Sequence, residues 1–168
     1  MTALRAGGAT DVGRVRQNNQ DCYLVEDNLF VVADGVGGHR GGEVASLTAI
    51  EAMRASFNEH EEPTLAELIG AVLQANRAVW EKAQADPQLR GMGTTLTALA
   101  LVVEDGEERL ALVNVGDSRA YLLQQGELSQ LTEDHSLVEE LVREGRLTRQ
   151  EAEVHPQRSL ITRALGLE

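Results

Sequence analysis

The sequence has little of several residue types that mark common classes of protein. Its single cysteine, Cys22, can form neither an internal disulfide nor a thiolate cluster, which disfavours a zinc site. Of the 15 basic residues only Lys82 is a lysine, and it lies far from any glycine-rich loop. Because P-loops and kinase phosphate sites both need a lysine at such a loop or strand, neither class fits this chain.

The composition also narrows the location and the partners of the protein. No apolar run is long enough to span a membrane, and the amino terminus lacks the pattern of a signal peptide. The formal net charge of −12 disfavours nucleic-acid and anionic membrane surfaces, which bind positively charged faces. We therefore expect a cytoplasmic protein that binds no nucleic acid and has no membrane segment.

Hydropathy patterns predict an α+β fold. Apolar residues recur at helical spacing over residues 43–57 and 64–85. Short apolar runs bounded by turn residues predict strands at 22–25, 29–33, 96–103, 109–115, 120–123 and 128–131, and a weak alternation over 6–13 predicts an edge strand. The 168 residues, 42% hydrophobic and 25% charged, suit a single domain spanning 1–168.

The most informative stretch, residues 31–42, is an apolar strand that ends in Asp34 and a run of glycines. A carboxylate at the end of a buried strand has a rigid support while its oxygens stay open. Gly35 follows, and it has no side chain that could block its own carbonyl oxygen. These features suit a metal site, but an isolated Asp-Gly pair is more often a simple turn, so this motif alone leaves both interpretations open.

A second aspartate is predicted to lie beside Asp34. Asp21 begins one strand of a hairpin that turns at 26–28 and Asp34 ends the other, so both should lie at the same end of the sheet. Two adjacent carboxylates repel unless a cation lies between them or one keeps its proton, which predicts a shared metal. The alternative is two separate, solvated turn aspartates. Asp117, in the turn 116–118, is a third aspartate at a strand end.

Residues 132–160 form a different kind of segment. The sequence predicts a short helix after Ser136 and a second helix over 148–154, where Thr148 and Glu151 have the spacing of a capping box. This polar, helical piece follows the predicted strands, so we expect a small flap beside the site. The alternative is an ordinary helical hairpin that makes no contact with the site.

Five motifs in this order resemble those of the bacterial PP2C-type (PPM) serine/threonine protein phosphatases. They are Arg-Gln-Asn-Asn-Gln-Asp at 16–21, Ala-Asp-Gly-Val-Gly-Gly-His at 33–39, Gly-Met-Gly-Thr-Thr at 91–95, Gly-Asp-Ser-Arg at 116–119 and Leu-Thr-Glu-Asp-His at 131–135. The later His-Pro-Gln-Arg-Ser at 155–159 resembles the family's flap. Five ordered motifs are far more specific than one glycine loop.

The resemblance implies a four-layer α-β-β-α sandwich with two antiparallel sheets. It also implies a dinuclear Mn²⁺ or Mg²⁺ centre, with a third, weaker ion, at which a metal-bound water hydrolyses phosphoserine and phosphothreonine in proteins. The partners would be phosphorylated proteins, among them Ser/Thr kinases and their substrates. Independently of the family, oxygen-only ligands select hard octahedral cations, and two such ions about 3.5 to 4 Å apart suit phosphoryl displacement.

The resemblance also implies roles for the metal ligands. Asp34 would bridge two ions, the carbonyl oxygen of Gly35 would bind one of them, and Asp21 would hold metal-bound water. Asp117 would belong to the third ion.

Two further residues are implied to act on the substrate. Arg16 would clamp the substrate phosphate with its bidentate guanidinium, the alternative being a surface arginine on a turn. His39 would donate a proton or contact the substrate. With the bridging Asp34, these two residues are the predicted catalytic residues.

One departure from the family pattern concerns the later aspartates. The family's metal centre also uses a Ser-Asp-Gly-like and an Asp-Asn-like motif, and neither occurs between the flap and Glu168. The chain is therefore expected to match the N-terminal two thirds of the family domain and to lack its C-terminal strands. The alternative function is a truncated or inactive module that binds a phosphoprotein or a partner without turnover.

Overall fold

The computed structural model describes residues 4–37, 41–57 and 61–167. Its strands are β1 (Asp21–Val25), β2 (Leu29–Val36), β3 (Gly93–Thr94), β4 (Leu96–Glu104), β5 (Glu107–Val115), β6 (Tyr121–Gln124) and β7 (Glu127–Gln130). Its helices are α1 (Gly41–Phe57), α2 (Leu65–Ala85), α3 (Leu137–Arg143) and α4 (Arg149–Val154), with a 3-10 turn, η1 (Pro87–Leu89), after α2.

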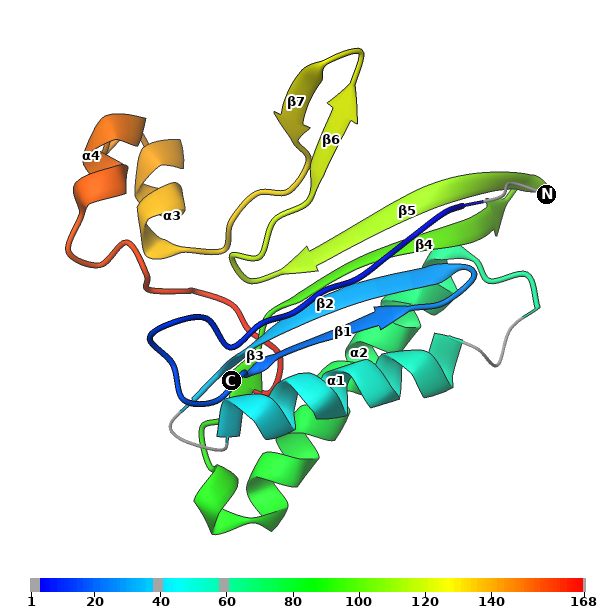
Figure 1. Ribbon diagram of the computed structural model, residues 1–168, viewed down its shortest axis with the longest axis horizontal. Coiled ribbons are helices and arrows are strands. Elements are labelled where there is room, and N and C mark those ends of the chain that lie inside the picture. The colour runs from blue at the N-terminus through cyan, green and yellow to red at the C-terminus, as the bar shows by residue number, and fades with distance from the viewer. Residues whose placement is uncertain (1–3, 38–40, 58–60, 168) are drawn as a thin grey trace.

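The strands form two antiparallel sheets. The larger has the order β1-β2-β4-β5, with β3 pairing beside β2, and the smaller is the β6–β7 hairpin. Helices α1 and α2 pack on one side of the larger sheet, while the β6–β7 hairpin, α3 and α4 lie beyond its other side (Figure 1). The predicted α+β fold with two antiparallel sheets is confirmed.

The core lies between the larger sheet and the pair α1 and α2. Alternate residues of β2, namely Leu29, Val31 and Ala33, are buried there because successive strand residues face opposite sides of the sheet. Val32, on the other face, keeps 47% of its surface exposed. Strand β2 is therefore buried on one face, because α1 and α2 cover only that side of the sheet.

Local signals set the starts of two helices. Thr64 is the N-cap of α2 and Thr148 the N-cap of α4, and each forms a capping box with a glutamate three residues later. The side-chain oxygen of each threonine accepts from a backbone N–H that no helical carbonyl can reach. The capping box predicted at Thr148 and Glu151 is confirmed.

Two predicted elements differ in the structure. Residues 6–13 form no strand; Gly8 instead lies against the ring of Tyr23, where a Cβ atom would not fit. Glycines in this stretch supply little strand propensity, and no neighbouring strand pairs with it. Strand β2 is longer than predicted, because Gly35 and Val36 pair with β3. Across the described ranges, no helix combines the length and the apolar character needed to cross a bilayer.

Candidate metal centre

Asp21 and Asp34 lie directly opposite each other on β1 and β2, as the hairpin register predicted. The alignment follows from the turn 26–28, which closes with the Glu26 N–H donating to the Leu29 carbonyl oxygen at 3.0 Å. Both carboxylates therefore lie at one end of the larger sheet, and they are neighbours rather than separate turn aspartates.

The carboxyl group of Asp34 shows the effect of this crowding. Its pKa is raised to about 6, first by partial burial and then by the neighbouring charge and hydrogen bond of Asp21. The charge of Asp117 raises the pKa further, whereas the guanidinium of Arg16 lowers it. The Asp34 carboxylate is thus held among acidic neighbours whose repulsion a divalent cation would relieve.

The backbone of Asp34 is held by Thr94, the last residue of β3, and by Thr95, which follows it. Its N–H donates to Thr95 Oγ1 at 3.0 Å, and its carbonyl oxygen accepts from the Thr95 N–H at 2.9 Å. The Thr94 hydroxyl donates to the same carbonyl oxygen at 3.0 Å. Thr94 and Thr95 are both fully buried, so these bonds form a rigid support for the carboxylate.

Gly35 lies where the end of β2 meets the start of α1. A Cβ atom at Gly35 would overlap the backbone of Gly42, and one at Gly42 would lie 2.8 Å from the Gly35 carbonyl oxygen. Only glycine at both positions permits this approach of helix to strand. The close packing fixes the Gly35 backbone next to Asp34.

Asp117 belongs to the turn that follows β5. Gly116 has a φ of 105°, a conformation that favours glycine, and His135 holds this residue from both sides. The Gly116 N–H donates to His135 Nδ1 at 3.1 Å, and the His135 N–H donates to the Gly116 carbonyl oxygen at 2.9 Å. Burial lowers the pKa of His135, and the charge of Arg163 lowers it further, which keeps Nδ1 available as an acceptor.

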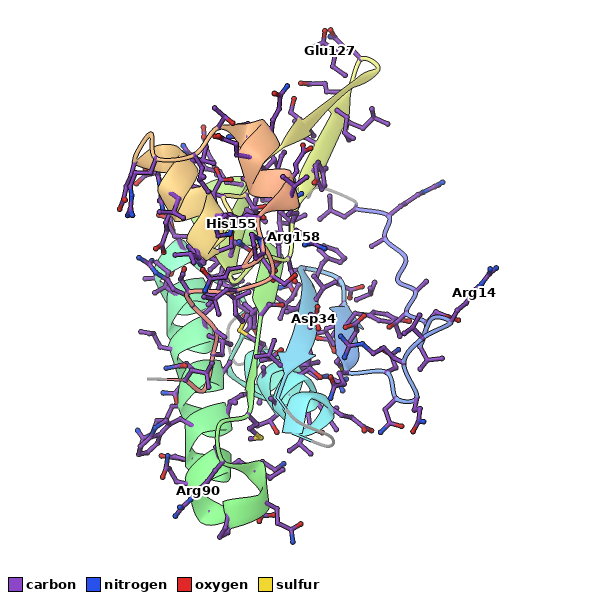
Figure 2. The ribbon with its side chains drawn as sticks, turned by 90° about the vertical axis from the view of Figure 1, so that its left-hand side faces the viewer. Arg14, Asp34, Arg90, Glu127, His155 and Arg158 are labelled. Atoms are coloured by element: carbon purple, nitrogen blue, oxygen red, sulfur yellow. The ribbon has the colours of Figure 1, made fainter. Side chains whose placement is uncertain are left out.

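One cavity of about 480 Å³ brings most of the predicted site residues together. Its lining includes Arg16, Asn18, Asn19, Asp21, Asp34, Gly35, Asp117, Ser159 and Ile161. Figure 2 shows Asp34 at the sheet while Arg14 projects away from it. The remaining predicted residue, His39, lies outside the described residues.

The donor set fits a hard divalent cation. Its candidate side-chain ligands are the carboxylates of Asp21, Asp34 and Asp117, and the Gly35 carbonyl oxygen is a further candidate. Among the described residues no three His, Cys, Asp or Glu side chains converge on one point. Each ion would therefore take only one or two carboxylates from this set and complete its shell with carbonyl oxygen and water, as Mg²⁺ and Mn²⁺ do.

The helical segment 132–160 borders the cavity. Its two ends pair with each other at an isolated bridge between Ser136 and Ile161, next to which the Leu137 N–H donates to the Leu160 carbonyl oxygen at 2.9 Å. A second cavity of about 660 Å³ lies between α3, α4 and Asp117. Ser159 of this segment lines both cavities.

Sequence reasoning assigned no role to several residues that support the site. Arg119 binds Asp134 with both Nε and Nη2, at 2.8 and 2.6 Å, and Asp134 is buried. Thr95 and Ser118 link the Asp34 and Asp117 turns through their hydroxyl groups, 2.7 Å apart. These residues lie in the motifs at 91–95, 116–119 and 131–135, but a hydroxyl or an ion pair that supports the backbone leaves no ligand-like spacing in the sequence.

The chain was compared with known families and structures. Residues 12–164 match the family model described as protein phosphatase 2C. The serine/threonine protein phosphatase PstP of Mycobacterium tuberculosis is 47% identical over 165 residues, covering 96% of this chain and 31% of that protein. The chain thus spans about a third of the length of this curated relative.

Solved structures agree with this match. A crystal structure of Mycobacterium tuberculosis PstP aligns with a TM-score of 0.89 and 47% identity, covering 99% of this chain and 70% of the other. The catalytic domain of PstP solved with two manganese ions aligns with a TM-score of 0.79 and 44% identity, covering 92% and 63% of the two chains. With its sequence motifs, its fold and its carboxylate site in agreement, the chain belongs to the protein phosphatase 2C (PPM) family of bacterial serine/threonine phosphatases.

Proposed function

We propose that this protein hydrolyses phosphoserine and phosphothreonine in proteins at a centre of two Mn²⁺ or Mg²⁺ ions, with a third, weaker ion nearby. The observation that carries the proposal is that Asp34 lines one cavity together with Asp21, Asp117 and Arg16. The two manganese ions in the structure of the PstP catalytic domain support it.

The proposed metal ligands are Asp21, Asp34, Asp117 and the Gly35 carbonyl oxygen. When bound, the two ions would activate water and neutralise charge on the phosphoryl group. Asp34 is suited to lie between the ions, because its raised pKa reflects repulsion that cations would replace with attraction. Asp21 orients water beside it, and the Thr94 and Thr95 bonds keep the Asp34 backbone from moving during the reaction.

The proposed substrate residues are Arg16 and His39. Arg16 is exposed and lines the same cavity as Asp21, Asp34 and Asp117, where it can reach a phosphate held beside the carboxylates. Its guanidinium can bind two phosphate oxygens at once. His39 is proposed as the proton donor to the leaving serine or threonine oxygen, or as a substrate contact.

The family match also supports proposals for the domain extent, the partners and the cellular location of the protein. Residues 1–168 would belong to one phosphatase domain, with 132–160 as a flap over the substrate. The partners would be phosphorylated proteins in the cytoplasm, among them Ser/Thr kinases and their substrates. The relatives that the chain matches are named phosphatases, which favours turnover over a module that only binds phosphoproteins.

The proposal is tested by Mn²⁺ titration and by hydrolysis of a phosphothreonine peptide. Asp34→Asn should abolish binding of an ion pair and Mn²⁺-dependent turnover. Asp27→Asn is the matched control, because Asp27 lies in the turn at the opposite end of the same hairpin. Equal metal stoichiometry and turnover in the wild type and Asp34→Asn would rule the proposal out.

A further inference from the structure

Thr95 is the residue that touches both carboxylate-bearing turns of the site. It lies between β3 and β4 and is fully buried. It makes two hydrogen bonds with the backbone of Asp34. Its hydroxyl oxygen accepts from the Asp34 N–H at 3.0 Å, and its own N–H donates to the Asp34 carbonyl oxygen at 2.9 Å. Towards the other turn, its hydroxyl oxygen lies 2.7 Å from Ser118 Oγ.

The Thr95 hydroxyl has one proton, and its acceptor is Ser118 Oγ. The Asp34 N–H occupies one lone pair of Oγ1, so the hydroxyl is fully satisfied when it donates its proton to Ser118 Oγ. A buried hydroxyl without an acceptor would be costly, which favours this direction. The Ser118 hydroxyl can then donate its own proton into the cavity of about 360 Å³ that Ser118 lines together with Asp21 and Asp34.

The Thr95 methyl group fixes the other side of the Asp117 turn. A Cβ atom at Gly116 would lie 2.6 Å from Thr95 Cγ2, so the Gly116 backbone packs directly on that methyl group. The Thr97 hydroxyl donates mainly to Asn114 Oδ1 at 2.5 Å and lies 3.3 Å from the Ser118 carbonyl oxygen, so it adds little to this support. Thr95 thus contacts the residues on both sides of Asp117 and also holds Asp34.

We propose that Thr95 is a positioning residue that couples the placement of Asp34 to that of Asp117, so that binding of an ion at either carboxylate strengthens binding at the other. The inference rests on the proposed metal centre. Polar groups that orient metal ligands contribute strongly to affinity, because a ligand free to turn loses entropy on binding. Thr95 holds the Asp34 backbone directly, and it holds Asp117 through the residues on either side of it, Gly116 and Ser118.

The first measurement needs no metal. Amide exchange of Asp34 in the metal-free protein should accelerate in Thr95→Val, which keeps the shape but loses the hydroxyl, and stay slow in Thr95→Ser, which keeps the hydroxyl. The second is calorimetric Mn²⁺ titration, in which Thr95→Val should weaken binding about 10- to 100-fold, whereas Thr95→Ser, which loses only the methyl contact to Gly116, should weaken it less. Combined with Asp117→Asn, Thr95→Val should cost less additional affinity than it does alone.

Three outcomes would overturn the inference. They are wild-type Mn²⁺ affinity in Thr95→Val, equal losses in Thr95→Ser and Thr95→Val, and additive effects of Thr95→Val and Asp117→Asn. If Thr95→Val does not fold, Ser118→Ala removes the same hydroxyl bond from its less buried end and should give a smaller loss of the same kind; no loss would count against the inference. Absence of Mn²⁺ binding by the wild type would instead overturn the proposed metal centre, while the exchange of the Asp34 amide would still show whether Thr95 holds that backbone.

Discussion

Arg119 holds both carboxylate oxygens of Asp134 through its Nε, at 2.8 and 3.0 Å, and one of them also through Nη2 at 2.6 Å. The Asp134 side chain is 9% exposed and that of Arg119 47%. Arg119 precedes β6 and Asp134 follows β7, so the pair links the two chain segments that flank the hairpin. Asp134 raises the pKa of Arg119 through this bond. The pair joins the second sheet to the segment that carries His135.

Loss of the Asp134 carboxylate should destabilise the protein. We expect Asp134→Ala to lower the free energy of unfolding by about 1.5–3 kcal/mol, because it removes charge-assisted bonds from a buried group. Glu107→Ala is the control, since the Arg109–Glu107 pair is exposed on both sides and should contribute less than about 1 kcal/mol. Urea denaturation measures both, and equal losses would contradict a special role for the buried pair.

The raised pKa of Asp34 predicts how the stability of the metal-free protein depends on pH. The folded pKa of about 6 lies above the ordinary 3.8, so the folded state holds this proton more tightly than the unfolded state. The resulting stabilisation is complete below pH 3.8 and is lost as the pH rises to about 6. Asp34→Asn should therefore raise the melting temperature of the metal-free protein at pH 7 but not at pH 3.5.

The same proton competes with metal. Mn²⁺ should stabilise the wild type increasingly as the pH rises through about 6, because the ion binds the ionised carboxylate. Melting curves with and without Mn²⁺ between pH 5 and pH 8 check this, with Asp27→Asn as the control. A pH-independent metal effect would show that Asp34 is not a ligand.

His135 predicts a pH effect of the opposite sign. Its pKa is lowered below 6.5, so the folded state favours the neutral ring that accepts from Gly116. This contribution is present above pH 6.5 and is lost as the pH falls below it. In His135→Asn, where Asn Oδ1 can replace Nδ1 as acceptor, this loss should disappear. The prediction would be contradicted if the free energy of unfolding of His135→Asn fell below pH 6.5 as steeply as that of the wild type.

Arg16 should act through binding of the substrate phosphate. Arg16→Ala should lower kcat/KM for a phosphopeptide by about 10- to 150-fold, mainly through KM, which corresponds to the loss of about 1.5–3 kcal/mol from a charge-assisted contact. Arg14→Ala is the matched control, because Arg14 is on the same loop and points away from Asp34 (Figure 2). Equal effects of the two changes would indicate general electrostatic attraction instead of a phosphate clamp.

Gly35 and Gly70 should respond in opposite ways to alanine. A Cβ atom at Gly35 would overlap the backbone of Gly42, so Gly35→Ala should destabilise the protein by about 3 kcal/mol and disturb metal binding. Gly70 lies inside α2 with nothing within 4 Å of a Cβ, so Gly70→Ala should stabilise by about 0.5–1 kcal/mol. Chemical denaturation compares them, and tolerance of alanine at Gly35 would show that α1 can move away from β2.

The sequence by itself determined the features that depend on local interactions. Apolar spacing identified α1 and α2, and the threonine–glutamate pair at Thr148 marked the start of α4. The turn at 26–28 set the hairpin register, which was enough to place Asp21 opposite Asp34. These features could be predicted because propensity, capping and turn closure each act within a few residues of the chain.

Only the tertiary structure decided which distant residues support the site. Thr95 follows Asp34 by 61 positions and precedes Ser118 by 23, and nothing in the local pattern indicates that one hydroxyl lies between them. Pairing with β3 extended β2 beyond Asp34, and the absence of a partner strand left 6–13 without regular structure. Strand pairing and the burial of hydroxyl groups depend on neighbours that folding brings together, so a sequence shows the ligands of a site more readily than the groups that hold them in place.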